Sequence, residues 1–384
     1  MAKSPRLSPS RIDQFFATLP DPRKRRLRIK HPLLNLIVMA LCGTIAGADN
    51  WEEIVQFAED QRDWLSRFLD LSNGIPSHDT FGRVFAALDP VAFQKCLLAW
   101  VQRLHEVTQG QVIAIDGKAA REAMARAGEQ GPLTLVSAWA TQNHVCLGQV
   151  AGEAGSNELG ALPRLLELLD LHGAIVTLDA LGCQKHIVAQ IVEQGGDYVI
   201  AVKGNQEKLE AAVHASFAAA LESDAATTAT ITRSEETHGR QERRLYTVLE
   251  VPDDFAELAS WSGLKSLVMV AREYVDAKGE THTGVRYYIS SLPAQVKRIA
   301  AAVRSHWGIE NRLHWVLDVA FREDRNRARA KHEQANLGVL RRTAIGMLKN
   351  TAGLKGSMHC KRQHAGWNNA AMEKVLFGCQ TSET

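Results

Sequence analysis

Apolar residues recur at three- and four-residue spacing from residue 33 to residue 106, which is the period of an amphipathic α-helix. The longest apolar run, residues 33–48, includes Asn35 and Thr44 and is shorter than the roughly 20 residues that cross a bilayer. We therefore expect a buried helix there and not a membrane segment. Another helix should begin at Pro90, because Asp89 before it is a good N-cap. The pattern predicts a small all-helical domain over residues 33–108.

After Gln111 the pattern changes to short apolar runs, which are typical of β-strands. Three strands are expected first, within residues 111–118, 133–141 and 144–152, followed by a helix over 157–172. A strand over 174–179, a helix over 184–195 and a strand within 197–206 complete the series. This alternation predicts a mixed α/β unit.

Residues 207–290 interrupt the alternation. After a helix near 207–222 comes a polar, threonine-rich stretch, and strands are then expected within 243–251, 266–275 and 285–292. We interpret this part as an insertion of mostly β structure. A long helix should follow from near Pro293 and end before Arg325, with more helices between 332 and 350.

The composition excludes several classes of protein. The 384-residue chain is 45% hydrophobic and 23% charged, which argues against a largely disordered or coiled-coil chain, and its length suggests two or three folding units. The six cysteines form no CxxC pair, so neither a zinc knuckle nor a redox pair is indicated. Scattered cysteines are typical of a reducing compartment, and we expect a cytoplasmic protein.

The net charge of +2 is unevenly distributed. Residues 1–32 contain nine Lys/Arg and two acids, and residues 304–364 contain thirteen and five. Residues 33–303 contain 22 basic and 34 acidic residues. Two basic segments that flank an acidic middle favour a polyanionic partner such as nucleic acid, although a pair of solvated surfaces would give the same counts.

Three acidic residues stand in positions that favour chemistry. Asp116 and Asp179 each close a short apolar strand, and acids at strand ends point into the crevice where α/β proteins place ligands. Glu310 lies on the long predicted helix, in a line of polar residues spaced four apart that also contains His306 and His314. Acids at such places are also common as caps and on solvated helices, so position alone leaves both interpretations open.

Three carboxylates at one place are expected where a protein binds hard divalent cations, because Mg²⁺ takes oxygen ligands. Two such ions about 4 Å apart can hold the attacking and leaving oxygens of an in-line phosphoryl transfer. Arginine can bind phosphate through two parallel hydrogen bonds, and several arginines occur around the third acid. They are Arg304, Arg312, Arg322, Arg325, Arg327 and Arg329.

Several long motifs resemble those of one enzyme family. The segments IAIDGK (113–118), VTLDALGCQK (176–185) and SHWGIENRLHWVLDVAFREDRNR (305–327) are similar to DDE transposases of bacterial insertion sequences. Within that family they resemble the branch of H-repeat-associated proteins linked to Rhs elements. The stretch from DPRKRR to GIPSHDTFGRVF is similar to the domain that precedes the catalytic core, and the whole resemblance covers about residues 10–370.

The resemblance implies an RNase H-like mixed sheet core with a mostly β insertion, preceded by a small all-α domain. Matched residue by residue, it makes Asp116, Asp179 and Glu310 the catalytic acids and the ligands of two expected Mg²⁺ or Mn²⁺ ions. It implies that the protein cleaves DNA at terminal inverted repeats, joins the freed 3′-hydroxyl to target DNA, and acts as a homo-oligomer.

Pattern and resemblance together divide the chain into five parts. These are a basic N-terminal segment (1–32), a helical transposase-associated domain (33–108), the catalytic core (109–206 and 291–350), the insertion (207–290) and a C-terminal tail (351–384).

The residues around the third acid depart from the Y-x2-R-x3-E-x6-K pattern of related transposases. Val303, His306 and Leu317 stand at the Tyr, Arg and Lys positions. The branch itself has HWxIENxLHW, so we do not interpret these changes as inactivation. The candidates for binding DNA are Lys118, Lys203, Asn205, Arg304, His306, His314, Arg325 and Arg327. A strand-ending turn would equally explain Lys203 and Asn205.

Two other hypotheses remain open. A catalytically silent protein that holds DNA ends would be expected to lack one of the three acids, and none is missing here. A zinc hydrolase would use His306, Glu310 and His314, because zinc prefers nitrogen ligands, and would leave Asp116 and Asp179 dispensable.

Overall fold

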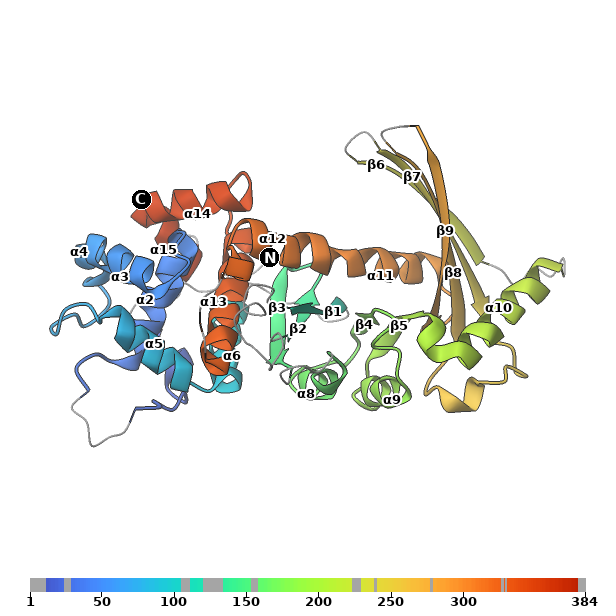
Figure 1. Ribbon diagram of the computed structural model, residues 1–384, viewed down its shortest axis with the longest axis horizontal. Helices are drawn as coiled ribbons and strands as arrows, with labels where there is room; N and C mark the ends of the chain where they lie inside the picture. The colour runs from blue at the N-terminus through green and yellow to red at the C-terminus, as the bar shows by residue number, and fades with distance from the viewer. Residues whose placement is uncertain are drawn as a thin grey trace, which may run out of the picture. The chain divides into compact units, whose positions relative to one another are not determined.

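The computed structural model describes residues 12–23, 29–104, 111–119, 134–152, 158–222, 229–237, 240–276, 279–325, 328 and 330–378. Half of the basic segment expected over residues 1–32 lies outside the described residues. Arg327, Arg329 and the end of the C-terminal tail lie outside them as well. The chain forms two compact units (Figure 1). The first comprises Met1–Thr108, Gly117–Ala161 and Glu310–Thr384, and the second comprises Gln109–Asp116 and Leu162–Ile309.

The first unit begins with the helices that the apolar spacing predicts. They are α1 (Asp13–Phe16), α2 (Leu33–Ala46), α3 (Trp51–Asp60), α4 (Arg62–Leu65), α5 (His78–Ala87) and α6 (Pro90–Leu104). The apolar run forms α2, whose stretch from Leu36 to Cys42 is fully buried, so the expectation of a buried helix is confirmed. The start of α6 is also as expected, because Oδ1 of Asp89 accepts a hydrogen bond from the Ala92 N–H at 2.7 Å.

Among the described residues, no single helix is both long and apolar enough to cross a membrane. Two helix pairs reach the required length only across sharp bends, of 95° between α2 and α3 and of 102° between α5 and α6.

The rest of the first unit consists of a hairpin and the C-terminal helices. The elements are β2 (Thr134–Ala140), β3 (Val145–Ala151), η3 (Glu158–Gly160), η6 (Glu310–His314), α12 (Trp315–Val319), η7 (Glu323–Arg325), α13 (Lys331–Asn350), α14 (Met358–Trp367) and α15 (Asn369–Phe377). The long helix α13 contacts α2, α5, α6 and β3. Its buried Asn336 donates two hydrogen bonds, to the carbonyls of Phe85 and Leu88 at 2.7 and 2.9 Å, and so ties α13 to the end of α5.

The second unit contains the parallel strands and the insertion. After the first residues of β1 (Val112–Ala119) come α8 (Leu162–Leu166), β4 (Ile175–Leu178), α9 (Lys185–Glu193), β5 (Asp197–Val202), η4 (Gly204–Gln206) and α10 (Glu207–Glu222). The insertion then supplies β6 (Ala229–Thr237), β7 (Arg240–Glu250), η5 (Leu258–Ser260), β8 (Ser266–Val275) and β9 (Thr281–Ser290), and α11 (Val296–Ile309) completes the unit. Buried residues of α11, including Ile299 and Val303, pack on β1, β4, β5 and the insertion strands in one hydrophobic cluster.

Nine strands of the described residues have the order β3-β2-β1-β4-β5-β9-β8-β7-β6. Strand β4 pairs in parallel with both β1 and β5. The other pairs are antiparallel: β2 with β3, β5 with β9, β9 with β8, β8 with β7, and β7 with β6. The first five strands in this order form the mixed sheet expected of an RNase H-like core, and the helices α1–α6 precede it. The predicted fold class is therefore confirmed.

Three local expectations are wrong. The helix expected over 157–172 begins only at Leu162, because Pro163 lacks an N–H and fits only the first helical turn. Asp116 lies within β1 and not at its end, since the strand continues to Ala119. The threonine-rich stretch, expected to be without a strand, forms β6, which pairs along its whole length with β7.

Candidate active site

Asp116 and Asp179 occupy equivalent places on neighbouring parallel strands of the second unit. The register pairs Val112 with Ile175 and Ala114 with Thr177, so each aspartate comes two residues after the same rung of the ladder. Neighbouring strands lie about 4.8 Å apart, and residues two apart share a face. The structure thus brings these two predicted residues to one edge of the sheet, and neither is fully buried.

The loop after β4 fixes the carboxylate of Asp179. Its Oδ1 accepts hydrogen bonds from the N–H groups of Leu181 and Gly182, at 3.0 and 3.3 Å. The loop is in turn held by η4, because Nδ2 of Asn205 donates to the Ala180 carbonyl at 2.8 Å. Only one oxygen of Asp179 is engaged by these backbone groups, so the arrangement orients a carboxylate whose other oxygen can face a ligand.

Strand β5 brings a basic residue to the same edge of the sheet. It pairs in parallel with β4, with Leu178 opposite Ile200, and Lys203 follows its last residue. The Lys203 side chain is exposed. A cation at the carboxyl ends of the parallel strands suits a polyanionic substrate, whereas the amide of Asn205 is already used to hold the neighbouring loop.

Helix α11 approaches the same strand ends from within the second unit. Nδ1 of His306 lies 3.1 Å from Oγ1 of Thr177, two residues before Asp179. The ring of Trp307 lies under the guanidinium of Arg286 on β9, at 4.9 Å. The last turn of α11 is therefore anchored to both the parallel strands and the insertion.

Glu310 directly follows α11, and the last chain segment of the first unit begins at this residue. It is exposed and begins η6, a five-residue π-helical turn, so the long predicted helix changes its hydrogen-bond pattern at the third acid and ends at Val319. Single π-helical turns within helices are frequently found at functional sites. The approach of Glu310 to the two aspartates is not fixed by the geometry of either unit, and the convergence of the three acids stays a prediction.

Within the first unit, Lys118 links the end of β1 to the segment after Glu310. Its Nζ lies 2.6 Å from Asp318 and 3.1 Å from Asp324, and its side chain is only 9% exposed. Burial raises the pKa of Asp318, and the hydrogen bond from Lys118 acts against that rise. Lys118 thus serves two carboxylates of its own unit, and its predicted contact with DNA stays a prediction.

For the remaining DNA-binding candidates the structure gives the exposure of the side chain, and their contact with DNA stays a prediction. Arg304, His306 and His314 are half-buried, and Arg325 is exposed at the end of η7. Arg327 lies outside the described residues.

Sequence reasoning missed one acid of the first unit. A Cβ atom on Gly117, the residue after Asp116, would lie 2.2 Å from the carboxyl group of Glu158, which therefore occupies the space that this glycine leaves. Glycine is the residue that permits so close an approach. The signal available in the sequence was the glycine of the IAIDGK motif, but Glu158 itself is far from it along the chain.

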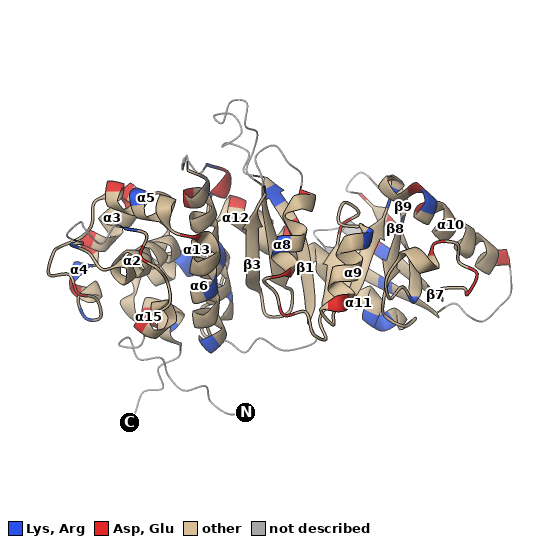
Figure 2. Cartoon of the chain, turned by 90° about the horizontal axis from the view of Figure 1, so that it is seen from below, with Lys and Arg blue, Asp and Glu red and all other residues tan. Residues whose placement is uncertain are grey.

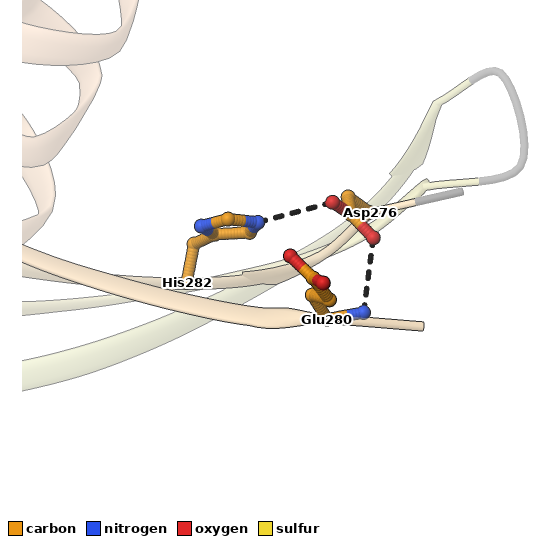
Figure 3. A group of neighbouring side chains, drawn as sticks. All are labelled: Asp276, Glu280 and His282. Atoms are coloured by element: carbon orange, nitrogen blue, oxygen red, sulfur yellow. Dashed lines mark hydrogen bonds and ion pairs between the residues drawn. The ribbon is translucent and has the colours of Figure 1, made fainter. Parts of the chain in front are cut away.

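One group of three metal-ligand types occurs in the described parts of the chain at mutual distances within 4.8 Å, and it is not the predicted trio. Asp276, Glu280 and His282 lie at the β8–β9 hairpin (Figure 3). Asp276 accepts a hydrogen bond from the Glu280 N–H at 2.9 Å and lies 3.1 Å from Nε2 of His282. These contacts close the hairpin by themselves, and we assign the group a structural role.

Comparison with known families decides the identity of the fold. A domain described as DDE_Tnp_1-associated matches residues 14–101, and the domain described as "Transposase DDE domain" matches residues 108–346. The chain belongs to the DDE transposase family. The resemblance stated from the motifs is therefore confirmed, and the second match includes all three candidate acids of this transposase.

Relatives of this transposase match it over nearly their whole length. "Putative transposase YncI" of Escherichia coli O157:H7 is 39% identical over 95% of this chain and 94% of its own. "H repeat-associated putative transposase YhhI" of Escherichia coli K12 is 36% identical over 96% and 98%. A short relative, "Inactive transposase YbfQ" of the same strain, is 35% identical over 19% of this chain and 87% of its own.

Proposed function

We propose that this protein cleaves DNA strands at the ends of an insertion sequence and transfers them into target DNA in a reaction that depends on divalent metal ions. The observation that carries the proposal is the equivalent placement of Asp116 and Asp179 on neighbouring parallel strands. Membership of the transposase family makes DNA the substrate. Glu310, which follows the helix that contacts β4, is the proposed third acid.

The donor set fits Mg²⁺ or Mn²⁺ and disfavours zinc. Carboxylate oxygens are the ligands that hard cations prefer, and the backbone hydrogen bonds to Asp179 hold one such group in a fixed orientation. When bound, two such ions would polarise the attacked phosphate and stabilise both the entering and the departing oxygen. His306, which a zinc site would need, is instead in contact with Thr177.

The chain's own residues would position the DNA around these acids. Lys203 would pair with a phosphate of the strand that is cut, which its exposure at the end of β5 supports. His306 would hold the last turn of α11 against β4 and so position the residue that follows that helix. We propose also that the protein works as a homo-oligomer on paired ends, in the cytoplasm of a bacterium.

The test uses the purified full-length protein and linear DNA that carries the sequences flanking its own gene. We expect strand cleavage with Mg²⁺ or Mn²⁺, no cleavage after EDTA treatment, and recovery when either ion is added back in excess. Analysis of radiolabelled products on sequencing gels reads out the position of the cut and the 3′-hydroxyl end. Cleavage that is unaffected by EDTA would contradict the proposal.

The alternative is a catalytically silent protein that binds DNA ends, which the existence of a relative named as an inactive transposase keeps relevant. It predicts specific binding to the same flanking DNA with no cut under any metal condition. Light scattering of the DNA complex would measure the number of protein copies bound to two ends in either case.

A further inference from the structure

Four basic side chains of the first unit come together at the tip of the β2–β3 hairpin. His144 lies in that turn, Arg312 in η6, Lys349 near the end of α13 and Lys361 in α14. Nη1 of Arg312 lies 3.3 Å from Nε2 of His144, and Nζ of Lys349 donates to the carbonyl of Arg312 at 2.8 Å. Nζ of Lys361 donates to the carbonyl of Leu348 at 3.1 Å. Segments that are far apart in the sequence thus build one cationic group.

This cationic group has no acidic partner in the part of the chain that the structure describes. Two other buried cations of the unit are paired with acids, Lys118 with Asp318 and Arg342 with Glu323. Here the charges instead act on each other: burial, then Arg312 and Lys361, lower the pKa of Lys349 to about 8. Burial, then Lys349, Arg312 and Lys361, lower the pKa of His144 to about 4. His144 is therefore uncharged at neutral pH, and the like charges of Arg312, Lys349 and Lys361 lack the counter-charge that partly buried charges normally have.

The group is held in place by rigid contacts. The aromatic ring of Trp139 on β2 lies 5.4 Å from Nζ of Lys349 and stacks on the ring of His144 with their centres 6.2 Å apart. His144 has a φ of 55°, which fixes the turn in the left-handed region, and the Asn350 amide donates to the Asn143 carbonyl in the same turn. The donors are therefore positioned before any ligand arrives.

The chemistry of these donors indicates a phosphate group. Arginine and lysine side chains are the usual partners of phosphate oxygens, and Nδ1 of His144 is a buried ring nitrogen without a hydrogen bond. Arg312 is exposed, so the group is open to a polymer. Figure 2 shows Lys and Arg positions in the region of α13, of which Arg341 and Arg342 are buried. Arg312 also lies two residues after Glu310, in the same π-helical turn.

We propose that His144, Arg312, Lys349 and Lys361 form a binding site for a backbone phosphate of the DNA, which holds the strand beside the π-helical turn of Glu310. The proposal deepens the proposed function, because the identification of the polyanion as DNA rests on it. The phosphate supplies the missing negative charge, and the four donors come from four different elements.

The first test measures binding of flanking DNA by fluorescence anisotropy across a range of NaCl concentrations, without metal. We expect Lys349→Gln and Lys361→Gln each to weaken binding about tenfold, as loss of one hydrogen bond to a charged group does. The slope of log Kd against log salt should fall by about 0.9 for each lost phosphate contact. Lys95→Gln removes an exposed charge from α6 of the same unit and should leave both quantities unchanged.

Unchanged affinity and slope in both variants, with native circular dichroism, would overturn the proposal. Inorganic phosphate serves as a second probe. If phosphate raises the melting temperature of the unsubstituted protein, while Lys349→Gln leaves the slope of log Kd for DNA against log salt unchanged, the group binds small anions and not DNA. Because binding is measured without metal, the two proposals can fail separately. If the protein never cuts DNA but the variants show the expected decrease in salt slope, the proposed function is refuted and the phosphate site is supported. If the protein cuts DNA but the variants leave the salt slope unchanged, the phosphate site is refuted and the proposed function is supported.

The pH dependence of binding gives an independent prediction. The groups that face Lys349 are Arg312, Lys361 and His144, all basic, so a bound phosphate should raise its pKa above the free value of about 8. Below pH 8 the lysine is charged in both states, and affinity should not vary through it. Above pH 8 binding must take up a proton, so affinity should fall by up to about tenfold per pH unit. Lys349→Arg, which stays charged, should bind DNA at pH 7 as the unsubstituted protein does, and its affinity should not decrease above pH 8 in this way. An equal decrease of affinity in both proteins would count against the site.

Discussion

Replacing Asp179 with Asn is expected to slow DNA cleavage by a factor of about 10³ or more, the scale seen when a group that stabilises developing charge is removed. The asparagine has the same shape, and its Oδ1 can still accept from the N–H groups of Leu181 and Gly182. What it loses is the negative charge that a divalent cation requires. Cleavage rates with Mg²⁺ measure the loss, while anisotropy without metal should show DNA binding within about twofold of the parent.

Asp170→Asn is the matched control for this change. Asp170 precedes β4 as Asp179 follows it, and it accepts a hydrogen bond from the His172 N–H at 3.1 Å. The variant removes one charge from the opposite end of the same strand and should cut normally. If Asp179→Asn cuts at a rate near that of this control, Asp179 is not a metal ligand, and Asp116→Asn tests the neighbouring strand in the same way.

Replacing Arg342 with Leu is expected to destabilise the protein by about 3–5 kcal/mol, because it leaves a buried carboxylate without its partner. Nη1 of Arg342 lies 2.8 Å from Glu323, the two side chains are 2% and 7% exposed, and Nε of Arg342 also donates to Ser137. Burial acts to raise the pKa of Glu323, but Arg342 and Arg341 outweigh it, so the pKa of this carboxyl is lowered. Urea denaturation at pH 7 measures the change in free energy of unfolding.

Two comparisons separate this effect from a general loss of packing. Arg67→Leu removes a second Arg–Glu pair of the same unit, with Glu373 at 3.0 Å, but that arginine is 65% exposed and its loss should cost below about 1 kcal/mol. The double variant Glu323→Leu with Arg342→Leu should be more stable than Arg342→Leu alone, since no charge is then left buried. A double variant less stable than the single one would mean that shape, and not the unpaired charge, explains the loss.

The strands that lead to the two predicted aspartates could be predicted because each is a short run of mostly apolar residues. Residues 112–115 and 175–178 are such runs, all of them buried, and Thr177 is their one polar residue. Strand β6 was missed because its residues alternate between threonine, isoleucine and charge. It is stabilised by the ladder with β7 and by packing of Ile231 on the hydrophobic cluster, and a local pattern encodes neither.

The candidate site was predicted in part for similar reasons. The place of an acid directly after a run of apolar residues can be recognised locally, and the register of β1 and β4 then brings two such places together. The π-helical turn at Glu310 could not be predicted, since it is a change in hydrogen-bond pattern without a distinctive composition. The group formed by His144, Arg312, Lys349 and Lys361 depends on three contacts between segments that are separate along the chain. The charge count pointed to residues 304–364 as basic, but it could not show which of those side chains meet at the turn of His144.

The pairing of β5 with β9 has a consequence for the folding of the protein during its synthesis on the ribosome. Strand β5 ends at Val202, but β9 begins only at Thr281, so its partner emerges about 80 residues later. At about 5–20 residues per second, the newly made core would wait roughly 4–16 s with the backbone groups of β5 open on one side. An open strand edge can pair with another nascent chain, so the length of the insertion sets a period in which co-translational chaperones would matter most for this transposase.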